Sequence, residues 1–195
     1  MAPFYTAKLH DFLSVLPEAL VGTLTLRLAD QGFDTNTLTA YSWEDEINKL
    51  QMSLKALSID FPESNQWQIF MEYVFPVIGK RVDCVILAND IILAIEYKGG
   101  QTSTAASALR QAQNYALDFS DFHEESKGRI VVPIALGTFK KRITLCSDQP
   151  KRGAAVSADD LPQTIHEAYN YWGAKQTAID PESWNKSRYF PVPTN

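Results

Sequence analysis

The chain has 195 residues, of which 45% are hydrophobic, and its formal net charge is −5 at pH 7. This length and apolar content suit one domain with a buried core. The lack of a long apolar span or a signal-like N-terminus in these residues predicts a cytoplasmic protein that does not enter a membrane. The negative charge argues against holding nucleic acid mainly by counterion release, and two cysteines, Cys84 and Cys146, are too few for a disulfide framework.

The first informative element is a helix predicted to begin at Ser42. Ser42 and Asp45 resemble a capping box at a helix N-terminus. The apolar residues that follow recur at helical spacing and form one stripe: Trp43, Ile47, Leu50, Leu54 and Leu57. Glu46 borders this stripe, whereas Glu44 and Asp45 point away from it. Glu46 is therefore a candidate for an acidic group at a site, and an exposed helical glutamate is the alternative.

The strand predicted within residues 67–76 carries a second acidic candidate. Glu72 lies there in a run of apolar and aromatic residues. Its side chain could reach the same end of the sheet as the charged residues of the next two strands, or it could face solvent. The sequence leaves open whether Glu46 or Glu72 contributes to a site.

A β-hairpin is predicted over residues 81–98. Its two strands, 81–87 and 91–98, are rich in β-branched and apolar side chains, and Asn89 and Asp90 between them are typical of a tight turn. Away from the charged positions both faces are apolar, as expected for central strands that are covered on both sides. One face is expected to carry Val82, Cys84, Ile86, Leu93 and Ile95.

The charged residues of this hairpin converge at one end. If the turn has two residues, Asp83 lies directly opposite Glu96, with Cβ atoms roughly 5 Å apart, and Lys98 shares the face of Glu96. Facing carboxylates repel each other, so one stays protonated unless a cation compensates them, and oxygen ligands suit Mg²⁺ or Mn²⁺. The alternative is two ordinary ion pairs, Asp83 with Arg81 and Glu96 with Lys98, and no metal.

A helix is predicted over residues 104–118, after Gly99 and Gly100 end the strand. Gln111 and Tyr115 are four residues apart, so they share one face of this helix. Taken alone, the pair has a simpler interpretation, in which Tyr115 packs in the core and Gln111 is solvated.

Together these residues resemble a known family. Asp83, Glu96-Tyr97-Lys98 and Gln111-x-x-x-Tyr115 are similar in order and spacing to the motifs of the PD-(D/E)XK nuclease superfamily, in the subgroup with the RecB-like Gln-x-x-x-Tyr motif. The resemblance implies an α/β fold with a restriction-endonuclease-like core, in which helices flank a mixed central β-sheet. The expected order of elements is helix, strand, hairpin, helix, strand.

The resemblance also assigns metal ligands. Asp83, Glu96 and the backbone carbonyl of Tyr97 would hold one or two Mg²⁺ or Mn²⁺ ions. Glu46 or Glu72 would complete the site, directly or through water. Such a site predicts an enzyme that cleaves phosphodiester bonds with the help of a divalent metal.

The remaining motif residues would act on water and substrate. Lys98 would orient the attacking water or stabilise the pentacovalent state. Gln111 and Tyr115 would position the substrate backbone or support Lys98 through hydrogen bonds. All five side chains that the resemblance marks as catalytic thus come from the hairpin and the helix after it: Asp83, Glu96, Lys98, Gln111 and Tyr115.

A longer arrangement covers nearly the whole chain and is similar to the nuclease-like module at the N-terminus of bacterial Schlafen-related helicases. In that family, a segment like residues 184–194 leads into a P-loop helicase, but no Gly-x-x-x-x-Gly-Lys-Ser/Thr motif occurs in this sequence. The resemblance implies a helicase domain or subunit as partner, in DNA processing or defence against phage. We therefore expect a nuclease-like domain over residues 1–173 and an extended tail over residues 174–195. In a longer protein of this family, such a tail would be the linker to a helicase domain.

Nucleic-acid contacts must be local in such an acidic chain. The candidates are the basic residues on either side of a strand-like segment at 143–146, namely Lys140, Lys141, Arg142, Lys151 and Arg152. The alternative for these residues is a solvated loop. A metal-neutralised site and a positively charged partner domain would both help an acidic protein to approach nucleic acid.

The sequence therefore predicts a metal-dependent nuclease that hydrolyses nucleic-acid phosphodiester bonds, with DNA favoured over RNA. One alternative is a catalytically inactive nuclease-fold module that binds nucleic acid or docks a helicase. Another is a protein-interaction domain. The oligomeric state and the choice between endonuclease and exonuclease action stay open.

Overall fold

The computed structural model describes residues 3–32, 37–75, 79–100 and 103–190. In chain order these residues form β1 (Tyr5–Lys8), α1 (Leu9–Ser14), α2 (Pro17–Asp30), α3 (Thr37–Asp60), η1 (Pro62–Gln66), β2 (Gln68–Phe75), β3 (Lys80–Ala88), β4 (Ile91–Lys98), α4 (Ala105–Phe122), η2 (Glu124–Ser126), β5 (Ile130–Gly137), β6 (Ile143–Cys146), β7 (Gly153–Val156), α5 (Leu161–Trp172) and α6 (Pro181–Asn185). The expected order of helix, strand, hairpin, helix and strand is present as α3, β2, β3–β4, α4 and β5. In the described part of the chain, no helix is long and apolar enough to span a bilayer.

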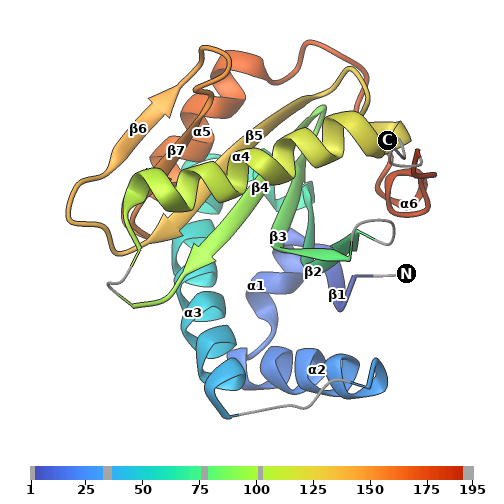
Figure 1. The fold of residues 1–195 in the computed structure, drawn as a ribbon, viewed down its shortest axis with the longest axis vertical. Coiled ribbons are helices and arrows are strands. Elements are labelled where there is room, and N and C mark those ends of the chain that lie inside the picture. The colour runs from blue at the N-terminus through green and yellow to red at the C-terminus, as the bar shows by residue number, and fades with distance from the viewer. Residues whose placement is uncertain (1–2, 33–36, 76–78, 101–102, 191–195) are drawn as a thin grey trace, which may run out of the picture.

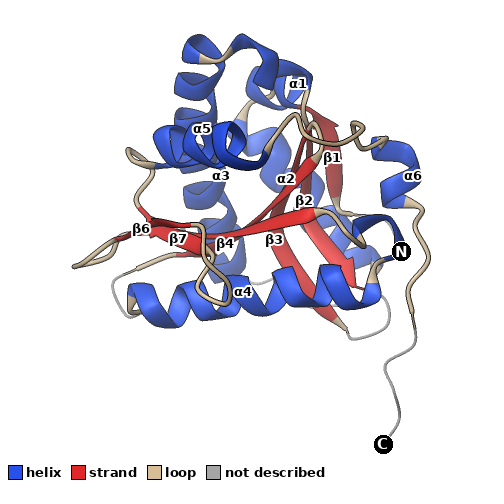
Figure 2. Cartoon of the chain, turned by 90° about the horizontal axis from the view of Figure 1, so that it is seen from above, coloured by secondary structure: helices blue, strands red, loops and turns tan. Residues whose placement is uncertain are grey.

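The strands form one seven-stranded sheet in the order β1-β2-β3-β4-β5-β7-β6. Strands β1 to β4 are antiparallel neighbours, β4, β5 and β7 run parallel, and β6 pairs antiparallel with β7. Helix α4 lies along one face of the sheet, and α1, α3 and α5 cover the other (Figures 1 and 2). The prediction of an α/β fold with a mixed sheet flanked by helices is confirmed.

The β3–β4 hairpin has the predicted register. Its ladder runs from Ala88 and Ile91, next to the turn, to Cys84 and Ile95. The turn begins at Asn89, whose φ of 60° lies in the left-handed region that asparagine tolerates better than most residues. The apolar side chains of both strands are buried on both faces, so this hairpin forms the centre of the sheet.

Helix α3 begins earlier than predicted. It starts at Thr37 rather than at Ser42, because the residues between them continue the helix without a breaker, so the interpretation of Ser42 and Asp45 as a capping box is wrong. The predicted apolar stripe is buried along its whole length: Trp43, Ile47, Leu50, Leu54 and Leu57. Glu46 is buried with this stripe and is only 3% exposed. The helix therefore carries a carboxyl group into the interior.

Most buried side chains of the sheet divide between two large cores, and a small third cluster joins Ala135 and Ala155 to the start of α4. The first core, under α1, α3 and α5, includes Cys84, and the second core, under α4, includes Val85. Val82 was expected on the face of Cys84 but lies in the second core, so that prediction is wrong. The alternation of faces along β3 is therefore interrupted at Asp83. The same interruption occurs on β2 at Glu72, which has a φ of 54° and whose two neighbours lie in different cores.

The segment 174–190 packs on the domain. The carboxylate of Asp90, in the hairpin turn, accepts hydrogen bonds from the backbone N–H groups of residues 174–176 at 2.7 to 2.8 Å. Further along, Trp184 of α6 is fully buried in the second core. The prediction of an extended tail is therefore wrong for residues 174–190, because this segment folds back onto the sheet and α4. Residues 191–195 lie outside the described part of the chain.

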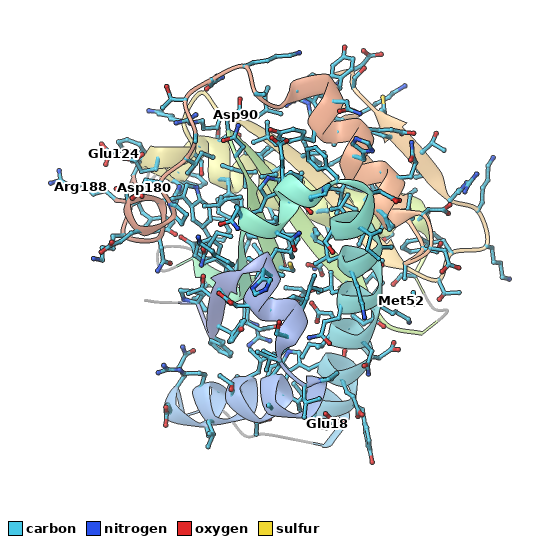
Figure 3. All side chains as sticks on the ribbon, turned by 180° about the vertical axis from the view of Figure 1, so that it is seen from behind. Glu18, Met52, Asp90, Glu124, Asp180 and Arg188 are labelled. Atoms are coloured by element: carbon cyan, nitrogen blue, oxygen red, sulfur yellow. The ribbon has the colours of Figure 1, made fainter. Side chains whose placement is uncertain are left out.

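The end of this segment lies beside the end of α4. The N–H of Glu124 donates to the carbonyl of Arg188 at 3.0 Å, and the N–H of Phe190 donates to the carbonyl of Phe122 at 2.8 Å. Figure 3 shows Glu124, Asp180 and Arg188 on the same side of the molecule. Phe190 thus belongs to the same folded unit as the sheet.

Candidate active site

The candidate site lies at the open end of the β3–β4 hairpin, away from its turn. The ladder between the two strands ends at Cys84 and Ile95, so the next position in the same register places Asp83 opposite Glu96. Beyond this point β3 stays paired with β2, and β4 stays paired with β5 as far as Lys98. The two strand pairs therefore diverge (Figure 1). Asp83 and Glu96 lie where the divergence begins.

Three acidic residues lie in a row across the sheet at this level. The two neighbours of Glu72 on β2 pair with the two neighbours of Asp83 on β3, so Glu72 and Asp83 stand side by side. Glu96 follows on β4. Helices from both sides of the sheet contact this row. Trp43 of α3 donates to Glu72, and Gln111 of α4 donates to Glu96.

Glu46 joins the row from α3. Its side chain is buried, and its charge interacts with those of Asp83, Glu72 and Glu96. Carboxyl groups from α3, β2, β3 and β4 are thus gathered in one cluster, which we call the carboxylate cluster. The sequence left Glu46 and Glu72 as alternatives, and the structure brings both of them into the carboxylate cluster.

Hydrogen bonds distinguish Glu46 from Glu72. Trp43 Nε1 donates to Glu72 Oε1 at 2.8 Å, and Arg81 forms an ion pair with the same carboxylate. Within the described residues, Glu46 Oε1 is buried without a hydrogen-bond partner. Glu46 is therefore the better candidate to complete a ligand set. From the sequence, Trp43 was assigned only to the apolar stripe, and its hydrogen bond to Glu72 was missed. The signal for this bond was that a buried indole N–H needs an acceptor.

Glu96 is held from both sides by donors. Lys98 Nζ donates to Glu96 Oε1 at 2.9 Å, and Gln111 Nε2 donates to the same oxygen at 2.6 Å. Gln111 Nε2 also lies 3.3 Å from the hydroxyl of Tyr115. Glu96 Oε2 is buried and has no partner among the described residues. The predicted Gln/Tyr pair of α4 thus borders the carboxylate cluster, with Gln111 contacting Glu96 rather than Lys98.

Asp83 is partly exposed and is held by the backbone. The N–H of Tyr97 donates to Asp83 Oδ2 at 2.8 Å, and the Asp83 carboxyl lies within hydrogen-bonding reach of the Glu96 carboxyl. Arg81, the expected partner of Asp83 in the metal-free alternative, pairs with Glu72 instead. The other half of that alternative, the pair of Glu96 with Lys98, is present.

The side chain of Tyr97 lies on the opposite face of β4 from Glu96, against α3. Its hydroxyl donates to Asp45, and Lys49 Nζ donates both to Asp45, at 2.8 Å, and to the Tyr97 hydroxyl, at 3.1 Å. These contacts fix the backbone of Tyr97 at the level of the carboxylate cluster. Sequence reasoning missed Asp45 and Lys49, because a carboxylate and an ammonium four residues apart are also the ordinary pattern of a solvated helix face.

Burial raises the pKa of every acid in the carboxylate cluster. It raises the pKa of Glu96 to about 8 and that of Glu72 to about 7, and in both the charge of Asp83 adds to the increase. Burial, with the charges of its neighbours, raises the pKa of Glu46 well above its usual value. It also raises the pKa of Asp83, against the opposing effect of the Tyr97 N–H. Without a compensating cation, the cluster therefore retains protons at neutral pH.

The unpartnered oxygens of Glu46 and Glu96 show what the cluster still requires. As carboxylate oxygens they are acceptors, so either added protons or a cation satisfies them. Carboxylate and carbonyl oxygens are the donor set that Mg²⁺ and Mn²⁺ prefer. Within the described ranges, no group of three His, Cys, Asp or Glu side chains is arranged to hold a metal ion. Mg²⁺ commonly uses a smaller protein set, of one or two carboxylates completed by water and phosphate oxygens.

The predicted basic residues fall into two separate groups. Strands β6 and β7 pair antiparallel, with Ile143 near the open end and Cys146 near the connection between them. Residues 140–142 therefore lie at one end of this pair, and residues 151–152 at the other. Only the first group directly follows β5, which ends beside Lys98 in the register of the sheet.

These basic side chains also differ in their contacts. Arg142 pairs with Asp160 at 2.7 Å, whereas Lys140 and Lys141 are exposed and have no ion-pair partner among the described residues. The guanidinium of Arg152 lies over the ring of Trp172, 5.2 Å from its centroid. Arg152 is thus used in packing, and the lysines of the first group are available at the end of the sheet where the carboxylate cluster lies.

No family model, curated protein or solved structure matches this chain. The similarity of its motifs to those of PD-(D/E)XK nucleases therefore rests on the residues of the carboxylate cluster and their geometry.

Proposed function

We propose that this chain is a metal-dependent nuclease that hydrolyses phosphodiester bonds in nucleic acid, with DNA favoured over RNA. The observation that carries the proposal is the carboxylate cluster beside Lys98, in which buried oxygens of Glu46 and Glu96 lack donors among the described residues. The arrangement of α3, β2, β3, β4, α4 and β5 around this cluster supports a restriction-endonuclease-like core.

Residues of the cluster would divide into ligands and supports. Asp83, Glu96 and Glu46, with the backbone carbonyl of Tyr97, would hold Mg²⁺ or Mn²⁺. When bound, such an ion supplies positive charge that lowers the pKa of water and offsets the charge that develops on the cleaved phosphate. Glu72 is paired with Arg81 and would support the neighbouring strand rather than bind the ion.

The polar residues around Glu96 would act on water and substrate. The Lys98 side chain is 24% exposed, and its ammonium is held on Glu96 Oε1, where it would orient the attacking water or stabilise the pentacovalent phosphate. Gln111 and Tyr115 are partly exposed on α4 and would position the substrate backbone. In the reaction, the water oxygen bonds to phosphorus, the ester P–O bond breaks, the water proton leaves to solvent, and the departing oxygen takes up a proton.

A cleavage assay tests this proposal. Labelled single-stranded and double-stranded DNA and RNA are incubated with the protein in Mn²⁺, Mg²⁺ or EDTA. We expect cleavage in metal only, and a loss of about 10²-fold or more in Glu96→Ala and Lys98→Ala. The exposed residues Glu44 and Lys55 provide the matched controls Glu44→Ala and Lys55→Ala, which should cleave normally. Cleavage that persists in EDTA, or in both site variants, contradicts the proposal.

A second candidate is a nucleic-acid-binding module that does not cut. It is favoured by the ion pairs Glu96 with Lys98 and Arg81 with Glu72, and by the lack of three metal-ligating side chains in one group among the described residues. This candidate predicts that nucleic acid binds equally well in EDTA and in Mn²⁺ and is not cleaved in either. The same assay with an added binding measurement therefore separates the two functions.

We also propose that the nuclease acts beside a helicase domain or subunit, in DNA processing or defence against phage. The support is the similarity of nearly the whole chain, in the order of its motifs, to the nuclease-like module of bacterial Schlafen-related helicases. The net charge of −5 adds to it, because a positively charged partner would help an acidic nuclease to hold its substrate.

A further inference from the structure

A cavity of about 630 Å³ lies between the first turn of α4 and the connection from β5 to β6. Its walls are residues 103–106 and residues 138–143. Figure 1 shows the start of α4 next to this connection. The volume falls within the range of about 300–1,000 Å³ that is usual for small-molecule sites.

The cavity opens at the same end of the sheet as Lys98. Strand β5 ends at Gly137, which pairs with Lys98, the last residue of β4. The two strands approach so closely that a Cβ atom at Gly137 would lie 2.9 Å from the Lys98 carbonyl oxygen and 3.0 Å from the ring of Phe139. The cavity wall begins at the next residue, Thr138. The cavity and the carboxylate cluster therefore lie at the same end of the sheet.

The walls combine an aromatic ring with free positive charge. Phe139 is half-buried and packs on the small apolar cluster that includes Ala105 and Ala108. Lys140 and Lys141 are exposed without an ion-pair partner in the described part of the chain. A simple anion would have no need of the ring, and an apolar ligand would have no need of two lysines. A nucleotide, which has a flat base and a phosphate, uses both.

We propose that this cavity binds one unpaired nucleotide of a single-stranded nucleic acid, with its base on Phe139 and its phosphate at Lys140 and Lys141. The inference rests on the proposed nuclease function and adds a substrate class to it. A base within a duplex is stacked and paired, so it could not lie against Phe139 unless it left the duplex. Stacking on one ring is tolerant of sequence, because every base has a flat face. The cavity thus selects for single strands, ends or frayed sites.

Binding in EDTA tests the inference without cleavage. The dissociation constant of a labelled oligothymidine of about twelve nucleotides is measured by fluorescence anisotropy, next to a duplex of the same length. We expect tighter binding of the single strand, and binding about fivefold or more weaker in Phe139→Leu, which keeps apolar volume but removes the ring. Phe139→Tyr keeps the ring and should restore binding to within about twofold. Tyr41→Leu, at a ring on α3 that is 64% exposed, is the matched control.

The lysines are tested by their salt dependence. For single strands, each neutralised phosphate contributes a slope of about −0.7 to the logarithm of affinity against the logarithm of salt concentration. The double variant Lys140→Ala/Lys141→Ala should therefore reduce the slope by up to about 1.4, while Lys55→Ala leaves it unchanged. A slope equal to that of the wild type in the double variant overturns the assignment.

The outcomes also separate this inference from the proposed nuclease function. Loss of binding in Phe139→Leu with rescue in Phe139→Tyr supports the nucleotide site, even if no substrate is cleaved in any metal. Metal-dependent cleavage with equal affinity for single strand and duplex, and no effect of Phe139→Leu, overturns the site and leaves the nuclease standing. Lack of binding to either oligonucleotide overturns the site as well.

Discussion

The two ends of the β3–β4 hairpin both bury acidic side chains, and they treat them in opposite ways. At the turn, Asp90 is 2% exposed, and its carboxylate accepts N–H groups from residues 174–176. Burial alone would raise the pKa of Asp90, but these donors lower it below its usual value. At the open end, burial raises the pKa of the whole carboxylate cluster, and oxygens of Glu46 and Glu96 lack donors in the described residues.

The difference separates an acid that serves the fold from acids that serve a site. Buried polar groups in folded proteins are nearly always hydrogen-bonded, so Asp90 behaves as expected of a structural group. Several under-satisfied carboxyl groups with raised pKa values in one place are typical of functional sites, because the fold gains nothing from their repulsion. The contrast therefore favours a functional interpretation of the open end, and variants at the two ends test it.

The largest expected effect is on catalysis at the open end. Glu96→Gln replaces a proposed metal ligand by a neutral group of the same shape, and we expect the cleavage rate in Mn²⁺ to fall by about 10²- to 10³-fold. The same change of charge at the turn, Asp90→Asn, should leave the rate of the folded enzyme within a few-fold of wild type. Single-turnover cleavage below the melting temperature of both variants provides the measurement. Equal losses in the two variants would remove the distinction between the ends.

The second effect is on stability at the turn. Asp90→Asn removes the charge that accepts three backbone N–H groups, and we expect a loss of about 3–4 kcal/mol in the free energy of unfolding. Because these donors belong to residues 174–176, proteolysis should then cut this segment faster. Chemical denaturation checks the magnitude, and Asp148→Asn, at an exposed aspartate in a loop, is the matched control with an expected change within about 0.5 kcal/mol.

A third prediction concerns His123, which ties α4 to the segment 174–190. Trp184 Nε1 donates to Ser126 Oγ at 2.9 Å, Ser126 Oγ donates to His123 Nδ1 at 2.7 Å, and His123 Nε2 donates to the Trp184 carbonyl at 3.0 Å. This set of hydrogen bonds suits neutral imidazole, because a proton on Nδ1 would remove the acceptor to which the Ser126 hydroxyl donates. Burial lowers the pKa of His123 to about 4.

The stability should therefore depend on pH through His123. Between about pH 6.5 and about pH 4 the unfolded chain binds a proton at this residue and the folded chain does not, so stability is lost as the pH falls through this window. The loss should reach roughly 2–3 kcal/mol. The free energy of unfolding of wild type and of His123→Gln is measured by denaturation over this pH range. The difference between the two proteins isolates the contribution of His123, since the other groups titrate in both. A difference between the two proteins that is constant with pH would contradict the assignment.

Much of the fold was readable from local patterns. The β-branched runs on either side of Asn89 and Asp90 fix the register of the hairpin, and that register alone sets Asp83 opposite Glu96. The apolar stripe of α3 was readable in the same way, because helical spacing identifies the buried face. The position of Trp184 was not, since a short helix after a polar segment gives no period from which its burial follows.

The site was only partly readable for a related reason. Strict alternation predicts that Val82 shares a face with Cys84, and the interruption at Asp83 breaks this rule. On the neighbouring strand β2 the interruption coincides with a left-handed backbone at Glu72, a conformation that glutamate rarely adopts and that no local sequence pattern predicts. The choice between Glu46 and Glu72 likewise depends on long-range hydrogen bonds.

The last prediction concerns the stability of the protein at Glu46, where we expect a small change. Glu46→Gln removes an acid whose pKa is raised by burial, and an acid of this kind lowers stability as the pH rises above its unfolded value of about 4.5. We therefore expect the variant to be about 1 kcal/mol more stable than wild type in EDTA at neutral pH. In Mn²⁺ the difference in stability should shrink or reverse, because a bound ion stabilises the wild type more than a variant that lacks a ligand.

Thermal melts of both proteins in EDTA and Mn²⁺ measure this difference. Glu44→Gln, at an exposed position on the same helix, should follow the wild type in both conditions. If Glu46→Gln is the less stable protein in EDTA, Glu46 supports the fold as Asp90 does, and the contrast between the two ends of the hairpin is reduced to Glu96 and Asp83.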